Sequence, residues 1–62
     1  MVSNSYELMM ETDTNIIICN FPHNRKGINN AFNAIKNQSN LIAATITSIR
    51  DGVIYEFPQN KG

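Results

Sequence analysis

The chain has 62 residues, which predicts a single domain spanning residues 1–62, with flexible tails at 1–5 and 59–62. A domain this short buries only about 60% of the surface that its unfolded chain exposes, so its stability is marginal without disulfides, a metal or self-association. The single cysteine, Cys19, excludes an intrachain disulfide, and Cys19 with His23 supplies too few ligands for a structural zinc site. We therefore expect a homo-oligomer that holds no metal and no cofactor.

Charge and hydropathy narrow the class of partner and the compartment. Five basic and five acidic side chains give zero formal net charge, which counts against nucleic acid as the main partner because proteins that bind duplex DNA usually carry a basic excess. The N-terminus has neither the basic start nor the apolar stretch of a signal peptide. The longest apolar run, residues 16–19, is far shorter than the roughly 20 residues of a membrane span. The sequence predicts a cytoplasmic protein without membrane contact.

The first half of the chain predicts two strands joined by a turn. Residues 6–10 alternate imperfectly between polar and apolar side chains and predict the first strand. Residues 12–15 are typical of a turn, because Asp and Asn side chains bond their own backbone. Residues 16–21 are apolar on both faces, which predicts a central strand covered on both sides. Pro22 ends this strand because proline donates no ladder hydrogen bond.

A helix over about residues 25–37 is the clearest element in the sequence. Four apolar residues fall at the i, i+3, i+4 and i+7 positions of one helical stripe: Ile28, Ala31, Phe32 and Ile35. The opposite face is rich in asparagine, which we interpret as a polar exterior. Asn24 is the predicted N-cap. Gly27 costs about 1 kcal/mol relative to alanine inside a helix, which leaves a start one turn later as an alternative.

The last segment predicts a hairpin. Asp51-Gly52 is the expected two-residue turn, because type I′ geometry needs positive φ at both central positions. This turn pairs Ile46 with Phe57 and Ser48 with Tyr55. It leaves apolar side chains on the sheet face away from the helix: Leu41, Ile49 and Ile54. We predict that these three residues form an oligomer interface, by sheet stacking or edge pairing.

The predicted fold is therefore a small α+β module of the ββαββ type. Its antiparallel sheet carries one amphipathic helix on one face, and its other face is the expected interface between copies.

The segment between the second strand and the helix is the candidate ligand-binding site. It combines basic and flexible residues at a helix N-terminus: His23, Asn24, Arg25, Lys26 and Gly27. Free backbone amides and the helix dipole favour anions at such a position. Arg25 can bind a phosphate or carboxylate through two hydrogen bonds, Lys26 adds a positive charge, and Gly27 allows a ligand to approach the backbone. The alternative interpretation is a solvated loop whose basic residues serve solubility.

Catalysis is not expected. Cys19 and His23 could form a nucleophile and base, but Cys19 lies in the most apolar strand, where a thiol is usually inert. The acidic residues Glu7, Glu11 and Asp13 could bind a divalent cation, although such residues more often form a solvated edge. A ligand pocket of about 300 Å³ would consume most of the core of a monomer this small, so a pocket fits only between subunits.

The sequence thus predicts a non-enzymatic binding protein or inhibitor that acts as a homo-oligomer and sequesters a target. A phosphate-bearing signalling nucleotide, held at residues 23–27, is the first candidate. The abundance of asparagine and isoleucine suggests an AT-rich genome, so we expect a phage or mobile-element protein that acts against host defence. One alternative is occlusion of a host protein by the exposed sheet face. Others are a small nucleic-acid-binding regulator using Arg25, Lys26, Lys36 and Arg50, and a subunit of a larger assembly.

Overall fold

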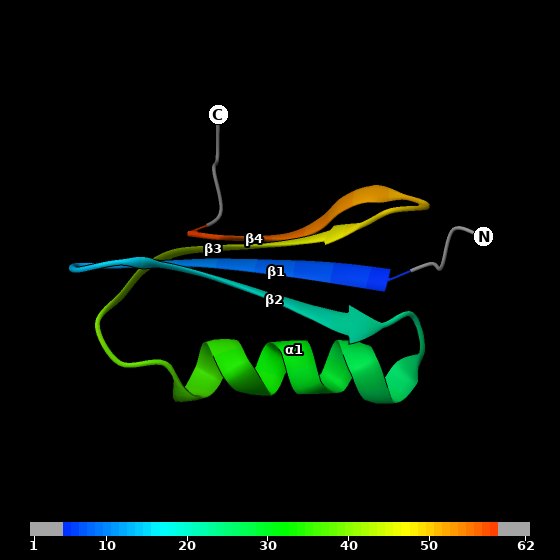
Figure 1. The fold of residues 1–62 in the computed structure, drawn as a ribbon, viewed down its shortest axis with the longest axis horizontal. Helices are drawn as coiled ribbons and strands as arrows, with labels where there is room; N and C mark the ends of the chain where they lie inside the picture. Colours follow the sequence, from blue (N-terminus) through cyan, green and yellow to red (C-terminus); the bar gives the residue numbers. More distant parts are fainter. Residues whose placement is uncertain (1–4, 59–62) are drawn as a thin grey trace.

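The computed structural model describes residues 5–58, which form a four-stranded antiparallel sheet and one helix (Figure 1). The elements in chain order are β1 (Ser5–Thr12), β2 (Ile16–Pro22), α1 (Arg25–Asn37), β3 (Leu41–Ser48) and β4 (Gly52–Phe57). This confirms the predicted α+β class with a single helix. The predicted tails lie outside the described residues, apart from Ser5, which begins β1.

The strands lie in the order β2-β1-β3-β4, and every neighbouring pair is antiparallel. The β1–β2 hairpin places β2 on one side of β1, and the chain then passes through α1 and returns as β3 on the other side of β1. As a result β2 and β3 are parallel, with β1 between them. The prediction that residues 16–21 form a central strand is wrong, because hairpin pairing and the return of β3 leave β2 at an edge.

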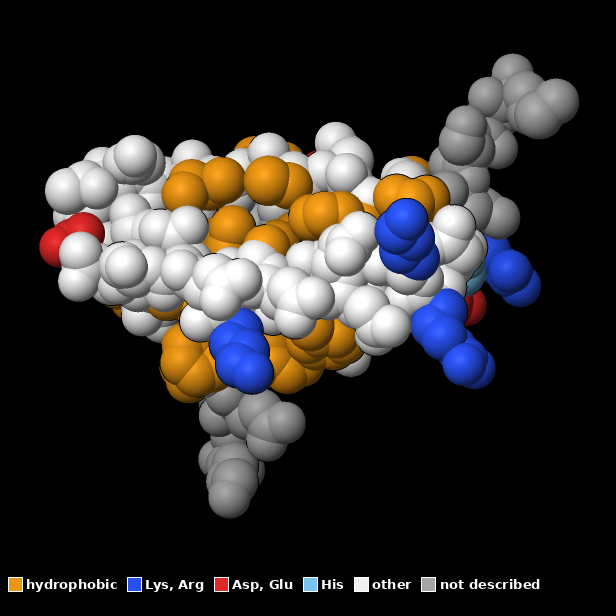
Figure 2. All heavy atoms as spheres, turned by 90° about the horizontal axis from the view of Figure 1, so that it is seen from below, with side chains coloured by type: hydrophobic (Ala, Val, Ile, Leu, Met, Phe, Trp, Pro, Cys, Tyr) orange, Lys and Arg blue, Asp and Glu red, His pale blue; other side chains and the backbone are white. Residues whose placement is uncertain are grey.

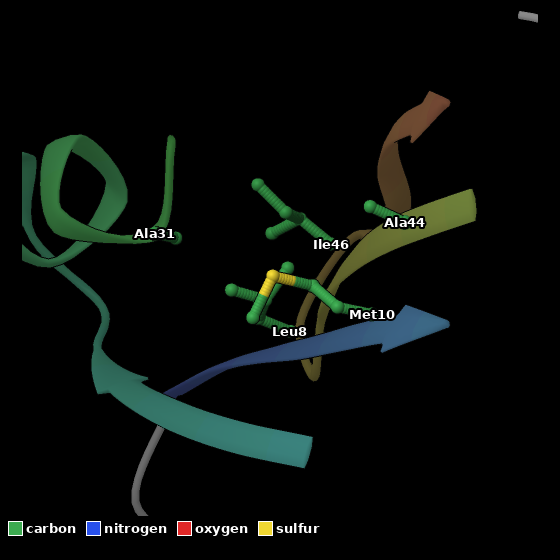
Figure 3. Close-up of a cluster of buried hydrophobic side chains, with 5 residues drawn as sticks. All are labelled: Leu8, Met10, Ala31, Ala44 and Ile46. Atoms are coloured by element: carbon green, nitrogen blue, oxygen red, sulfur yellow. The ribbon is translucent and has the colours of Figure 1, made fainter. Parts of the chain in front are cut away.

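The core lies between α1 and the sheet. Its fully buried apolar residues are Leu8, Met10, Ala31, Ala44 and Ile46. Figure 3 shows the Leu8, Met10 and Ile46 side chains pointing from the two central strands toward Ala31 on α1. Leu8 lies near the middle of the sheet, opposite Cys19 of β2 on one side and Ile46 of β3 on the other. Side chains on β1 and β3 alternate accordingly between the helix side and the open side of the sheet.

Helix α1 begins at the predicted residue because Asn24 caps it. The Asn24 backbone is extended, and its Oδ1 accepts a hydrogen bond of 2.7 Å from the Gly27 amide. The helix packs on β2, β1 and β3. Phe32, a member of the predicted apolar stripe, lies at the margin of the core, where its ring meets Tyr55 of β4 edge to face with centroids 5.0 Å apart.

The described part of the chain has no helix with the length and apolar character that a membrane crossing requires.

Gly27 is required by the close approach of α1 to the end of β2. It is buried, and a Cβ atom at this position would collide with the carbonyl oxygen of Pro22. The helix tolerates the lower propensity of glycine here because any side chain would push its first turn away from β2. Gly27 therefore has a packing role.

The β3–β4 turn differs from the predicted two-residue loop. Ser48 lies opposite Gly52, so the loop contains three residues, and Gly52 takes a φ of +84° at the start of β4. The buried Ser48 Oγ accepts hydrogen bonds of 3.2 Å from the amides of Arg50 and Asp51, which closes the turn. Ile46 consequently pairs with Tyr55, so the predicted pairing of Ile46 with Phe57 is wrong.

Candidate functional site

The five residues predicted to bind an anion are adjacent in the chain, but their side chains diverge. The His23 ring stacks on Tyr6 of β1, with centroids 4.4 Å apart and planes 16° apart. Its Nε2 atom is buried, lies 3.8 Å from Asp51 Oδ2 and has no hydrogen-bond partner among residues 5–58. His23 is thus turned toward the β3–β4 turn and packs between β1 and that turn.

Two further members of the predicted site have structural roles. Asn24 uses its side-chain oxygen to hold the Gly27 amide, and its own carbonyl accepts the Ile28 amide. Gly27 is buried against Pro22. Its amide is bonded to the Asn24 side chain, and the Pro22 carbonyl fills the space beside its Cα atom. The expectation that Gly27 lets a ligand approach the backbone is wrong, because the Pro22 carbonyl occupies that space.

Arg25 and Lys26 remain as the exposed part of the predicted site. Both are solvent-exposed in the first turn of α1. No carboxylate among residues 5–58 forms an ion pair with either of them. Two cationic side chains at the positive end of the helix dipole therefore face solvent.

The residues that the sequence offered for catalysis or metal binding lie on different sides of the sheet. Cys19 is a half-buried free thiol that packs against the core. Within residues 5–58 no three His, Cys, Asp or Glu side chains cluster closely enough to hold a metal ion. Glu7 and Glu11 are exposed on β1, on the side away from the helix.

The predicted oligomer residues do not share one surface. Leu41 is half-buried, lies opposite Thr12 and packs against the core. Ile49 is exposed in the turn at the other end of β3, about 25 Å along the strand from Leu41. Ile54 lies where the pairing of β4 shifts by one residue. Strict alternation along residues 41–49 had put Leu41 and Ile49 on one face, but the register shift at Thr12 turns Leu41 toward the core and the three-residue loop takes Ile49 out of the strand.

The open side of the sheet carries the apolar surface instead. Its large exposed side chains and their exposed fractions are Met9 (43%), Ile16 (61%), Ile18 (58%) and Val53 (59%). Met9 lies at the middle of this face, directly opposite Ile18 on β2 and Thr45 on β3. No helix or strand of residues 5–58 covers this side of the sheet (Figure 1).

The same open face is acidic. Three exposed carboxylates lie on it: Glu7, Glu11 and Glu56. Of the cationic residues between 5 and 58, Arg25, Lys26 and Lys36 lie on α1, and Arg50 lies in the β3–β4 turn. The charges of this neutral chain are therefore unevenly placed, with three of its five carboxylates on the open sheet face and three of the four cations among residues 5–58 on α1.

A second apolar surface lies beside the helix. Figure 2, which views the helix side, shows hydrophobic side chains on both sides of a mostly polar band. Phe32 of α1 is exposed there, and so is Phe57 of β4, which lies opposite the buried Ala44 of β3. A helix about 10 Å wide does not span four strands spaced about 4.8 Å apart, so side chains at both margins stay uncovered.

A scan against protein-family models, a search of the curated proteins and a search of the solved structures each found no significant match to this chain. The chemistry of its own surfaces is therefore the basis for assigning it a function.

Proposed function

We propose that this chain is a non-enzymatic binding protein that docks a partner protein on its open sheet face. The observation that carries the proposal is the uncovered apolar centre formed by Met9 and Ile18, surrounded by carboxylates. Exposed apolar patches of a few hundred Å² are typical of interaction sites. An inhibitor that occludes its target works through such a surface and needs no catalytic group.

The chemistry of the face defines the partner. A complementary surface is apolar at its centre, to cover Met9 and Ile18, and basic at its rim, to meet Glu7, Glu11 and Glu56. Exposed charges at a rim act mainly on the association rate, so added salt slows association more than it speeds dissociation.

The test is a comparison of three immobilised proteins exposed to the same cell lysate: wild type, Met9→Lys and Asn33→Lys. Met9 lies at the centre of the open face, whereas Asn33 is exposed on the helix. We expect the wild type and Asn33→Lys to retain the same protein, and Met9→Lys to lose it because a charge is buried in an apolar contact. Retention by Met9→Lys, or equal loss with Asn33→Lys, rules out docking on the open face.

A second candidate function is sequestration of a phosphate-bearing small molecule at the start of α1. The observation that favours it is that Arg25 and Lys26 are exposed and have no carboxylate partner among residues 5–58. Titration with a nucleoside phosphate, followed by amide chemical shifts, tests it. Shifts at residues 25 and 26 that disappear in the Arg25→Ala, Lys26→Ala double variant and persist in Lys36→Ala support binding there. Unchanged spectra, or shifts that survive the double variant, exclude it.

A further inference from the structure

We propose that the outer edge of β2 pairs antiparallel with β2 of a second copy of this chain, which joins two four-stranded sheets into one of eight strands. The pairing uses the free edge of the strand and is independent of what the open sheet face binds.

The first argument is a conflict between the sequence of β2 and its position. A strand that is apolar on both faces is typical of the interior of a sheet, yet β2 lies at an edge. On the open side it exposes Ile16 and Ile18 by more than half, and on the helix side Ile17, Cys19 and Phe21 are only half-buried. Pairing with a second copy would make β2 an interior strand and cover these side chains from the side.

The second argument is that β2 lacks the features that keep edge strands apart. Edge strands are commonly protected by charged side chains, bulges, short length or a covering element. Residues 16–22 carry no charge, and β2 is seven residues long with an unbroken register against β1. Its only protective residue is Pro22, at the last position. Because no strand among residues 5–58 pairs with the outer edge of β2, the backbone N–H and C=O groups there are available to another strand.

The third argument selects this pairing over stacking of two open faces. Stacking would bring Glu7, Glu11 and Glu56 of two copies together on a face that carries no Lys or Arg from residues 5–58. Like charges across an interface are strongly unfavourable. Pairing of β2 with β2 brings together two uncharged strands, so it has no such repulsion.

The geometry of the pair follows from its symmetry. Two identical antiparallel strands are related by a two-fold axis perpendicular to the sheet, and full overlap of residues 16–22 centres the axis at Cys19. Ile18 then lies opposite Asn20 of the other copy. Both open faces point the same way, so the dimer presents two copies of the Met9 surface side by side to one partner.

The test is sedimentation velocity of the purified full chain with two matched variants. Ile18 and Val53 have nearly equal exposure on the same open face, but they lie on opposite edge strands, β2 and β4. We expect the wild type to sediment at twice the 7.0 kDa chain mass, Ile18→Lys to weaken dimerisation at least tenfold, and Val53→Lys to leave it unchanged. A monomeric wild type, or a dimer that both lysines or neither lysine disrupts, overturns the proposal.

Two controls guard against misfolding and report the geometry. Asn20→Lys adds a charge at an exposed polar position of β2, so dimer loss in this variant with an unchanged circular dichroism spectrum supports edge pairing. Mild oxidation provides the geometric readout, because opposed cysteines on paired antiparallel strands lie within disulfide distance. We expect a disulfide-linked dimer of the wild type through Cys19 and much slower cross-linking of Asn20→Lys. A dimer that forms no cross-link contradicts the register centred on Cys19.

Discussion

The two edge strands of this sheet, β2 and β4, differ in nearly every feature that governs edge behaviour. β4 has six residues, a shift in its pairing between Ile46 and Thr47 of β3, an exposed Glu56, and Pro58 directly after its end. β2 is longer, regular and uncharged. Among residues 5–58, one edge thus carries several protective features and the other almost none, which is the contrast on which the proposed pairing of β2 rests.

The two edges are also held in place by different means. The end of β2 is fixed to α1 by the contact between Gly27 and Pro22 and by the Asn24 cap. β4 is attached through its pairing with β3, through the Ser48 turn and through the contact between Phe32 and Tyr55. Substitutions at these attachments test each edge separately.

The largest expected effect is at the β2 attachment. Gly27→Ala places a Cβ against the Pro22 carbonyl and forces α1 away from β2, which we expect to lower the free energy of unfolding by about 3 kcal/mol. Gly52→Ala at the start of β4 is the matched control, since open space surrounds Gly52 and only its φ of +84° opposes a side chain. Its cost should be about 1 kcal/mol. Urea denaturation of both variants measures the difference, and equal losses would contradict the close contact at Gly27.

The next effect is at the β4 attachment. Ser48→Ala removes the buried hydroxyl that accepts the amides of Arg50 and Asp51, and we expect a loss of about 2 kcal/mol. Amide hydrogen exchange should accelerate at residues 50 and 51 while residues 6–10 of β1 stay protected. Ser39→Ala, at an exposed position after the helix, should leave stability unchanged. A Ser48→Ala protein as stable as the wild type would show that the turn does not depend on this hydroxyl.

A smaller effect is expected at the cap of α1. Asn24→Ala leaves the Gly27 amide without its acceptor, which should reduce the free energy of unfolding by about 1 kcal/mol. Asn29→Ala on the exposed helix face is the control, and it should be neutral or slightly stabilising because alanine has the higher helix propensity. Thermal unfolding followed by circular dichroism distinguishes the two, and equal midpoints would argue against the cap.

The smallest effect concerns the aromatic contact between α1 and β4. A double-mutant cycle with Phe32→Leu and Tyr55→Leu should give a coupling energy of about 0.5–1 kcal/mol, as is typical of edge-to-face rings. Val53→Ala combined with Phe32→Leu serves as the reference cycle and should be additive, because Val53 lies on the open sheet face, away from the helix. Additivity in the Phe32–Tyr55 cycle would mean that the ring contact does not help to hold β4.

Local chemistry allowed several features to be predicted from the sequence. The apolar period of residues 28–35 and the cap at Asn24 predicted the helix at its observed bounds, because both signals act within one or two turns. At the candidate ligand site the sequence correctly grouped basic residues at a helix start, but it did not show that His23 stacks on Tyr6 or that Gly27 faces Pro22. Both contacts join segments whose relative placement depends on packing.

The sequence by itself determined the number and type of elements and the uncharged, apolar character of β2. Only the tertiary structure decided that β2 lies at an edge, that Met9 and Ile18 share an uncovered face with three carboxylates, and that Leu41 packs against the core. Strand order and register are set by which faces pack together and how each turn closes, as the three-residue loop after Ser48 shows. A pattern along the chain reports that a strand is apolar on both sides, whereas the assembled sheet determines which side is left uncovered.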